Sequence, residues 1–150
     1  MGQRIKPVRF EFGKDILVQS IEVDSKGGLF KVTNSGAPID GLIVDIPGGA
    51  LGKKANIQLG YNDGQLQVRS GKGCGVAAFV RIEPVVTFLK PVKITVPYNV
   101  SLNPLAVTGY LIDEEGHLHL LDTEGMNAAK GTVAFYTFKP LLFTWVYIME

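Results

Sequence analysis

The chain has 150 residues, of which 46% are hydrophobic and 19% are charged. This length and composition predict one folded domain and exclude an intrinsically disordered chain. Fifteen basic and fourteen acidic residues leave a net charge of +1. No long run of one sign occurs, so we expect neither nucleic acid nor an anionic membrane as a partner.

Cys74 is the only cysteine, which excludes an internal disulfide bond and a zinc site built on cysteines alone. The first ten residues lack the apolar core of a signal peptide. The longest apolar run, LLFTWVYIM near the C-terminus, is shorter than the roughly 20 residues that span a bilayer. We expect a soluble protein with no membrane insertion. Its compartment, and whether it belongs to a longer secreted or multidomain protein, stay open.

Alternation of apolar and polar residues predicts β-strands along most of the chain. In chain order, the predicted strands lie in residues 15–23, 28–34, 55–62, 65–69, 92–98, 110–112, 117–121, 132–138 and 141–148. Eighteen glycines and eight prolines separate these runs, and no window has helical periodicity. We therefore predict an all-β fold, a β-sandwich of roughly ten short, mostly antiparallel strands in a single domain, residues 1–150.

Two turns in this series predict β-hairpins. Asn62-Asp63-Gly64 favours a tight turn with positive φ angles. Residues 113–116 predict a second hairpin, in which we expect Ile112, Leu118 and Leu120 to face inward.

The stretch 45–54, DIPGGALGKK, comes close to a phosphate-binding loop. Such a loop has four residues between two glycines, then Lys and a hydroxyl residue, and it opens a helix. Here three residues separate Gly48 from Gly52, and Lys54 replaces the hydroxyl residue. A strand follows instead of a helix, so no helix N-terminus is available for a phosphate. We interpret the stretch as a turn between strands.

Three motifs in this region resemble the ZU-five domain, named for zonula occludens and netrin-receptor proteins and also found in ankyrins. They are Ile-Pro-Gly-Gly-Ala-Leu at 46–51, Phe-Leu-Lys-Pro-Val at 88–92 and Pro-Tyr at 97–98. The resemblance covers about residues 24–100, and residues 101–150 look like the hairpin and closing strands of prokaryotic versions. It implies a β-sandwich that serves assembly or scaffolding, as in ankyrins, where the domain contributes to spectrin attachment.

The matched motifs have structural roles. Pro47 cannot donate a hydrogen bond and ends a strand. Gly48 and Gly49 let the backbone turn, and we expect Ala50 and Leu51 to tuck under the end of the sandwich. The resemblance therefore transfers no site residue, and it implies a non-enzymatic module that binds another protein or a domain of its own parent chain.

His117 and His119 are spaced to chelate a metal from one strand face. A third ligand is not evident, although Asp113 or Asp122 could approach across the hairpin. We interpret the two histidines as solvated and predict no metal and no cofactor. Gly71, Gly73 and Gly75 do not complete a dinucleotide fingerprint, because Val76 replaces its third glycine.

No nucleophile, base and orienting group come together in the sequence, so we predict no catalytic residues and no enzyme. Some relatives of the ZU-five fold cleave themselves at a His-Phe-Ser step. Leu142-Phe143-Thr144 is the nearest match here, and Leu142 cannot accept the proton of the Thr144 hydroxyl. We therefore expect an intact chain, with autoproteolysis as a weaker alternative.

A second alternative is a carbohydrate-binding or adhesion module of a secreted or surface bacterial protein, which exposed aromatic residues on one sheet face would favour. We expect the aromatic residues of the last strands, Phe135, Phe143, Trp145 and Tyr147, to lie in the core instead. Edge strands and end loops, including the glycine-rich residues 70–75, are the natural binding surfaces. We predict a monomer or a weak dimer.

Overall fold

The computed structural model of the protein describes residues 9–66 and 75–148. These residues form thirteen strands and one short 3-10 helix, which confirms the predicted all-β fold. The elements are β1 (Phe10–Glu11), β2 (Asp15–Val23), β3 (Gly28–Lys31), β4 (Ile43–Ile46), β5 (Ala55–Asn62), β6 (Gln65–Leu66), β7 (Ala77–Glu83), β8 (Val92–Pro97), η1 (Val100–Leu102), β9 (Ala106–Ile112), β10 (Leu118–Leu120), β11 (Asp122–Asn127), β12 (Thr132–Thr137) and β13 (Leu141–Ile148). Within the described residues, no helix has the length and apolar character needed to cross a membrane.

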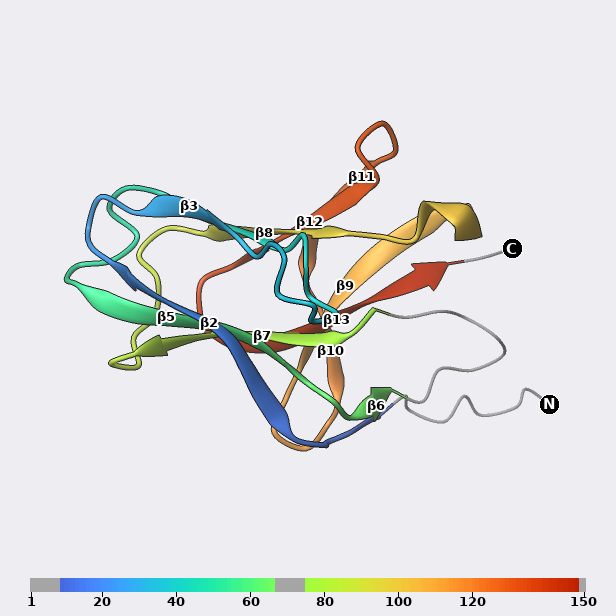
Figure 1. The fold of residues 1–150 in the computed structure, drawn as a ribbon, viewed down its shortest axis with the longest axis horizontal. Coiled ribbons are helices and arrows are strands. Elements are labelled where there is room, and N and C mark those ends of the chain that lie inside the picture. The colour runs from blue at the N-terminus through green and yellow to red at the C-terminus, as the bar shows by residue number, and fades with distance from the viewer. Residues whose placement is uncertain (1–8, 67–74, 149–150) are drawn as a thin grey trace.

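Two antiparallel sheets form the layers of a sandwich (Figure 1). One has six strands in the order β10-β9-β13-β7-β5-β2, and the other has five in the order β11-β12-β8-β4-β3. A third, two-stranded sheet pairs β1 with β6. The chain changes layer between β2 and β3, so residues 24–27 connect the two layers.

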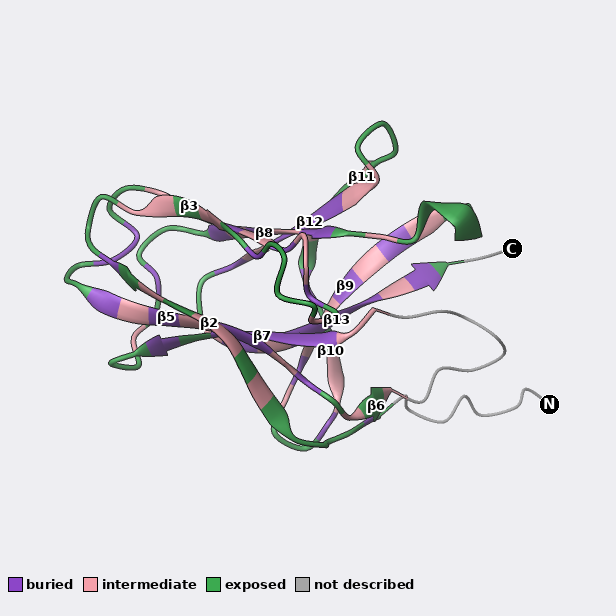
Figure 2. Ribbon diagram, in the orientation of Figure 1, coloured by how far each residue is buried: buried purple, intermediate pink, exposed green. Residues whose placement is uncertain are grey.

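The main core lies between the two large sheets, and buried positions alternate along their strands (Figure 2). In β8, Val92, Ile94 and Val96 are fully buried, whereas Lys93 and Thr95 point outward. This is the alternation expected of strands with one face in the core and one in solvent. The core draws on strands from both halves of the chain, β2 to β13.

A second, smaller apolar cluster lies on the outer face of the six-stranded sheet. It contains Phe10, Ala77 and Ile112, with Leu66, Leu118 and Leu142 packed against it. Because Ala78 and Phe143 belong to the main core, their neighbours Ala77 and Leu142 must point to the opposite face. The N-terminal strand β1 therefore covers part of the outer face.

The predicted hairpin at Asn62-Asp63-Gly64 is wrong. None of these residues has a positive φ, and β6 pairs with β1 instead of β5. The reason is that the buried Asn62 side chain accepts hydrogen bonds from the backbone N–H groups of Gly13 and Gly64, both at 2.8 Å. The chain therefore leaves β5 toward the N-terminal segment. Residues 67–69 of the predicted strand lie outside the described residues.

The predicted hairpin at residues 113–116 is confirmed, because β9 and β10 pair with Leu118 opposite Ile112. Ile112 is buried and Leu118 is half-buried, but Leu120 is 72% exposed, so its predicted inward position is wrong. Leu120 lies on β10, the outermost strand of its sheet. The next residue, Leu121, enters the core instead, and its N–H donates to the Gly109 carbonyl at 2.9 Å.

Candidate functional site

Two loops meet at one end of the sandwich. Residues 47–54 connect β4 to β5, and residues 84–91 connect β7 to β8. The Leu89 N–H donates to the Ala50 carbonyl oxygen at 2.8 Å, and Lys90 Nζ donates to the Gly48 carbonyl oxygen at 2.9 Å. The motifs at 46–51 and 88–92 are therefore hydrogen-bonded neighbours in the fold.

The first loop adopts the structure that its sequence predicts. Strand β4 ends immediately before Pro47. Gly49 has φ of +85°, a conformation that favours glycine, and its N–H donates to the Ser25 carbonyl oxygen at 2.8 Å. This turn directs Ala50 and Leu51 into the core, where both are buried. No helix follows, so the interpretation of this stretch as a turn between strands is confirmed.

The second loop is anchored at one point and exposed on either side of it. Phe88 is buried, and its N–H donates to the Phe138 carbonyl oxygen at 2.7 Å. Val85 and Leu89, in contrast, are 85% and 68% exposed. The peptide bond between Glu83 and Pro84 is cis. An ordered loop that holds large apolar side chains in solvent is a feature of binding surfaces.

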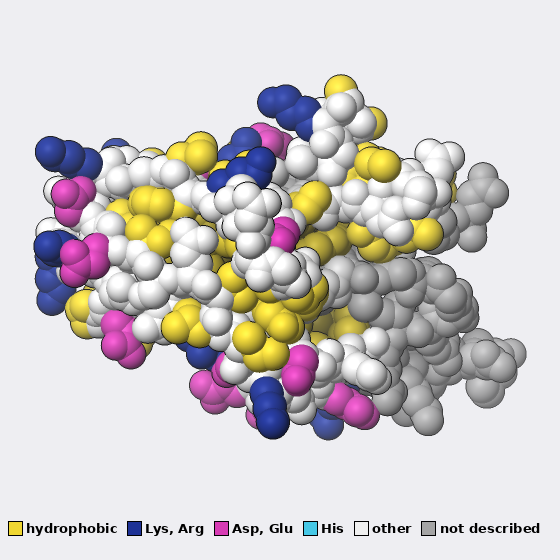
Figure 3. Space-filling model, in the orientation of Figure 1, with side chains coloured by type: hydrophobic (Ala, Val, Ile, Leu, Met, Phe, Trp, Pro, Cys, Tyr) yellow, Lys and Arg dark blue, Asp and Glu magenta, His cyan; other side chains and the backbone are white. Residues whose placement is uncertain are grey.

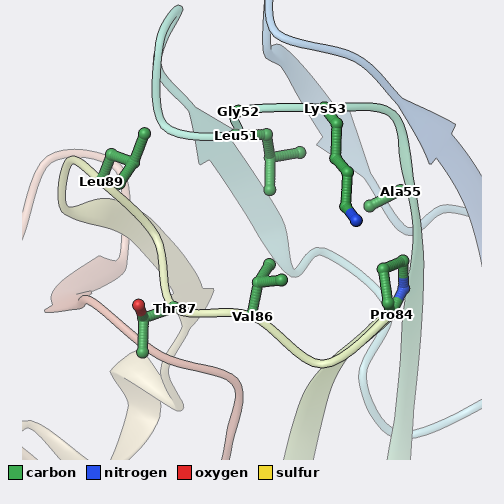
Figure 4. Close-up of a pocket in the computed structure, with 8 residues that line it drawn as sticks. All are labelled: Leu51, Gly52, Lys53, Ala55, Pro84, Val86, Thr87 and Leu89. Carbon is green, nitrogen blue, oxygen red and sulfur yellow. The ribbon is translucent and has the colours of Figure 1, made fainter.

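Between the two loops lies a cleft of about 370 Å³, which we call the end cleft. It is lined by Leu51, Gly52, Lys53, Ala55, Pro84, Val86, Thr87 and Leu89. Figure 4 shows Leu51 and Lys53 pointing from one loop toward the other, and Val86 and Leu89 pointing back across the gap. The floor and walls are thus mainly apolar.

Lys53 is the only charged residue among the eight that line the end cleft. Nearby, Lys54 Nζ lies 3.4 Å from Glu22 Oε2, and Lys90 binds the Gly48 carbonyl. Lys53 makes no ion pair with any residue that the structure describes. Figure 3 shows basic side chains at this end of the molecule (left), with acidic ones among them. An uncompensated cation next to an apolar cleft favours a ligand that combines an apolar group with a carboxylate.

The chain matches no protein-family model and no curated protein.

The structure brings His117 and His119 to Asp113, one of the two acids that the sequence placed within reach. His119 Nε2 lies 2.7 Å from Asp113 Oδ2, and His117 Nδ1 lies 3.8 Å from the same oxygen. The hydrogen bond from His119, together with those from the backbone N–H groups of His117 and Glu115, lowers the pKa of Asp113 to about 2. In residues 9–66 and 75–148, no three His, Cys, Asp or Glu side chains are grouped to hold a metal ion.

Most of the glycine-rich segment, with Cys74, lies outside the described residues. Gly75 is described, and its N–H donates to the Trp145 carbonyl oxygen at 2.7 Å. Its own carbonyl accepts a hydrogen bond from Thr144 Oγ1 at 3.0 Å. The predicted core position of Phe135, Phe143, Trp145 and Tyr147 is confirmed, because all four are buried.

Sequence reasoning missed the end cleft and the role of the N-terminal residues. The signal for the cleft was the apolar run Pro84-Val85-Val86, which belongs to no predicted strand. Sequence reasoning also missed a cluster on the outer face of the six-stranded sheet. There Arg81 stacks on Phe79, with the guanidinium carbon 4.1 Å from the ring centre, and its guanidinium group binds the Asp15 carboxylate. Cross-strand proximity of these residues depends on register, which the sequence alone did not provide.

Proposed function

We propose that this chain is a non-enzymatic protein-interaction module of the ZU-five type, and that its end cleft binds a segment of another protein or of a further domain of the parent chain. The observation that carries the proposal is the end cleft itself. Its loops are tied together by the Leu89–Ala50 hydrogen bond, yet they expose Val85 and Leu89 to solvent. Apolar side chains kept in solvent on an ordered loop gain free energy when a partner covers them.

The chemistry of the end cleft indicates what the partner segment presents. The apolar walls suit one or two aliphatic or aromatic side chains, because a volume of about 370 Å³ is at the small end of ligand pockets. Lys53 suits a carboxylate beside them. The expected ligand is thus an extended peptide with a large apolar residue adjacent to Asp or Glu.

The carbohydrate-binding alternative has less support. Aromatic platforms for sugars need exposed rings, and Trp145 and Tyr147 are both buried in the core. No cluster of exposed aromatic side chains occurs on the described sheet faces: the exposed rings, Phe12 and Phe138, belong to connecting segments.

A peptide-display selection against the immobilised protein tests the proposal. We expect the selected peptides to share an apolar residue next to an acidic one, and to lose at least about tenfold in affinity for Leu89→Ser, which corresponds to about 1.4 kcal/mol. Leu29→Ser is the matched control, because Leu29 is also an exposed leucine (65%) but lies on β3 and does not line the cleft. Both variants should keep the stability of the wild type within about 0.5 kcal/mol.

A charge reversal at Lys53 tests the electrostatic part separately. Lys53→Glu should abolish the preference for acidic peptides while leaving the fold intact. A selection that returns no peptide, or peptides that bind Leu89→Ser and Leu29→Ser equally well, would show that the end cleft is not a protein-binding site.

A further inference from the structure

We call residues Arg9–Phe12 the arm. The arm lies between β6 on one side and residues 116–117 on the other, and we call this space the slot. On one side, β1 pairs with β6, with Phe10 opposite Leu66. On the other side, Arg9 pairs with His117, and the Phe10 N–H donates to the Gly116 carbonyl oxygen at 2.7 Å. The two-residue strand β1 thus has hydrogen-bonded neighbours on both sides, like a central strand of a sheet.

Phe10 is the side chain that anchors the arm. It is 3% exposed and fills the small apolar cluster on the outer face of the six-stranded sheet, against Ala77 and Ile112. The ring of Phe12 meets that of Phe10 edge-on, with 5.2 Å between their centres. Burial of one phenylalanine contributes about 1.5–3 kcal/mol, so Phe10 is the main apolar anchor of the arm.

Two glycines, Gly64 and Gly116, lie on opposite sides of the slot and leave room for the backbone of the arm. A Cβ on Gly64 would lie 2.0 Å from the Glu11 carbonyl oxygen, and one on Gly116 would lie 2.3 Å from the Phe10 carbonyl oxygen. Gly116 also has φ of +86°. Any side chain at either position would block the backbone of the arm.

His117 adds a polar contact that fits the arm. Arg9 Nη2 lies 2.9 Å from His117 Nε2. Because a guanidinium group only donates, the His117 nitrogen must accept this hydrogen bond. The slot thus recognises two consecutive side chains, Arg9 through a hydrogen bond and Phe10 through burial.

Only Gly13 and Lys14 separate the arm from β2. Both are exposed, and β2 is the outermost strand of the six-stranded sheet. This hinge is bound at the Gly13 N–H by Asn62 Oδ1 (2.8 Å) and at the Lys14 N–H by Asp63 Oδ1 (2.6 Å). Short hinges at an exposed edge favour exchange of an element between copies of a chain.

We propose that the slot is an interaction site for the arm of a second copy of this chain, so that two molecules exchange arms and form a symmetric dimer. The contacts of Arg9 and Phe10 are made with β6, the 113–116 turn and the outer sheet face, all distant in sequence. The arm of a second copy has the same sequence, so it can make the same contacts in this slot. The exchange is independent of the end cleft.

Concentration and hinge length decide which form is populated. A short tether gives the arm an effective concentration of about a millimolar at its own slot, so the wild type is expected to exchange arms only at comparable protein concentrations. Deletion of Gly13 and Lys14 shortens the reach of the arm by roughly 7 Å. The arm then cannot enter its own slot but can still enter that of a second copy.

Light scattering on the hinge-deleted chain tests this. We expect a dimer at micromolar concentration, and a monomer when Phe10→Ala is added, because Phe10 provides the anchor. A hinge-deleted chain that is folded by circular dichroism but remains monomeric up to about a millimolar would overturn the proposal.

If the deletion prevents folding, a disulfide test on the chain without the deletion gives the answer. Glu11 and Gln65 are opposite each other in the β1–β6 pair, so we would introduce Glu11→Cys and Gln65→Cys with Cys74→Ser. Oxidation in dilute solution should give a cross-linked monomer, and oxidation after incubation at about a millimolar should give a covalent dimer. The control carries Glu11→Cys without Gln65→Cys. Equal dimer yields from both chains, or no dimer at either concentration, would overturn the proposal.

Discussion

His119 Nε2 lies 2.7 Å from Asp113 Oδ2, and this contact ties β10 to the turn that precedes it. The other oxygen, Asp113 Oδ1, accepts hydrogen bonds from the backbone N–H groups of Glu115 and His117, both at 2.9 Å. One carboxylate thus holds the whole hairpin turn. These hydrogen bonds favour its ionised form, which lowers its pKa to about 2 from an ordinary value of 3.8.

We predict that His119→Ala raises the pKa of Asp113 toward 3.8, because the hydrogen bond from His119 is the largest cause of the shift. A lowered pKa contributes stability at pH values above about 4, and this contribution is lost as the pH falls toward about 2. Carboxyl-carbon NMR of the wild type and the variant, titrated over this range, measures the change. His119→Gln, which keeps a donor, is the control. Identical Asp113 titration curves for the wild type and His119→Ala would contradict the assignment.

Gly109 on β9 lies under the ring of Phe135, which reaches it across the core from β12 in the opposite sheet. A Cβ on Gly109 would lie 2.4 Å from Phe135 Cδ1, and Phe135 is fully buried. We predict that Gly109→Ala lowers the free energy of unfolding by about 1–3 kcal/mol through overpacking, measured by chemical denaturation.

Gly125→Ala is the matched control, because a Cβ at Gly125 has no heavy atom within 4 Å. Its effect should stay within about 0.5 kcal/mol. Phe135→Leu, added to Gly109→Ala, should recover part of the lost stability. If Gly109→Ala proves as stable as the wild type, the sheets are not packed as closely here as described.

The sequence predicted those parts of the fold in which one face of a strand is buried. Val92, Ile94 and Val96 alternate with Lys93 and Thr95 because β8 has the core on one side and solvent on the other. The turn at residues 113–116 was also predictable, since Gly116 supplies its positive φ.

Tertiary contacts decided the parts that the sequence did not predict. Asn62-Asp63-Gly64 has a hairpin composition, but the Asn62 side chain binds the N-terminal segment instead. The arm is too short to have periodicity. The end cleft requires residues 47–54 and 84–91 to meet, and neither loop indicates its partner. The ZU-five motif at residues 46–51 predicted a turn there, and the resemblance did not predict a cleft between the two loops.

Asn62 is a buried amide that organises the hinge. Its Oδ1 accepts from the N–H groups of Gly13 and Gly64, and its Nδ2 donates to Asp15 Oδ1, all at 2.8 Å. We predict that Asn62→Ala lowers the free energy of unfolding by about 1–3 kcal/mol, because it removes the partner of two backbone donors. Thermal and chemical denaturation measure the loss.

Asn56→Ala provides the comparison on the same strand. Asn56 Oδ1 accepts the Ser20 hydroxyl at 2.9 Å on the exposed face, so the expected change is within about 0.5 kcal/mol. Equal losses for both variants would mean that the Asn62 hydrogen bonds contribute no more than a surface contact.

Thr144 is the residue on which self-cleavage would depend, and we predict that the chain remains whole. Thr144 is 1% exposed, and its Oγ1 donates to the Gly75 carbonyl oxygen at 3.0 Å. A hydroxyl in this position needs a base to remove its proton before it can attack the Phe143 carbonyl. The two histidines instead contact Asp113 and Arg9 at the hairpin turn. Intact mass spectrometry after several days at neutral pH should give one species, both for the wild type and for Thr144→Val. Fragments that end at Phe143 in the wild type and are missing in Thr144→Val would refute the prediction.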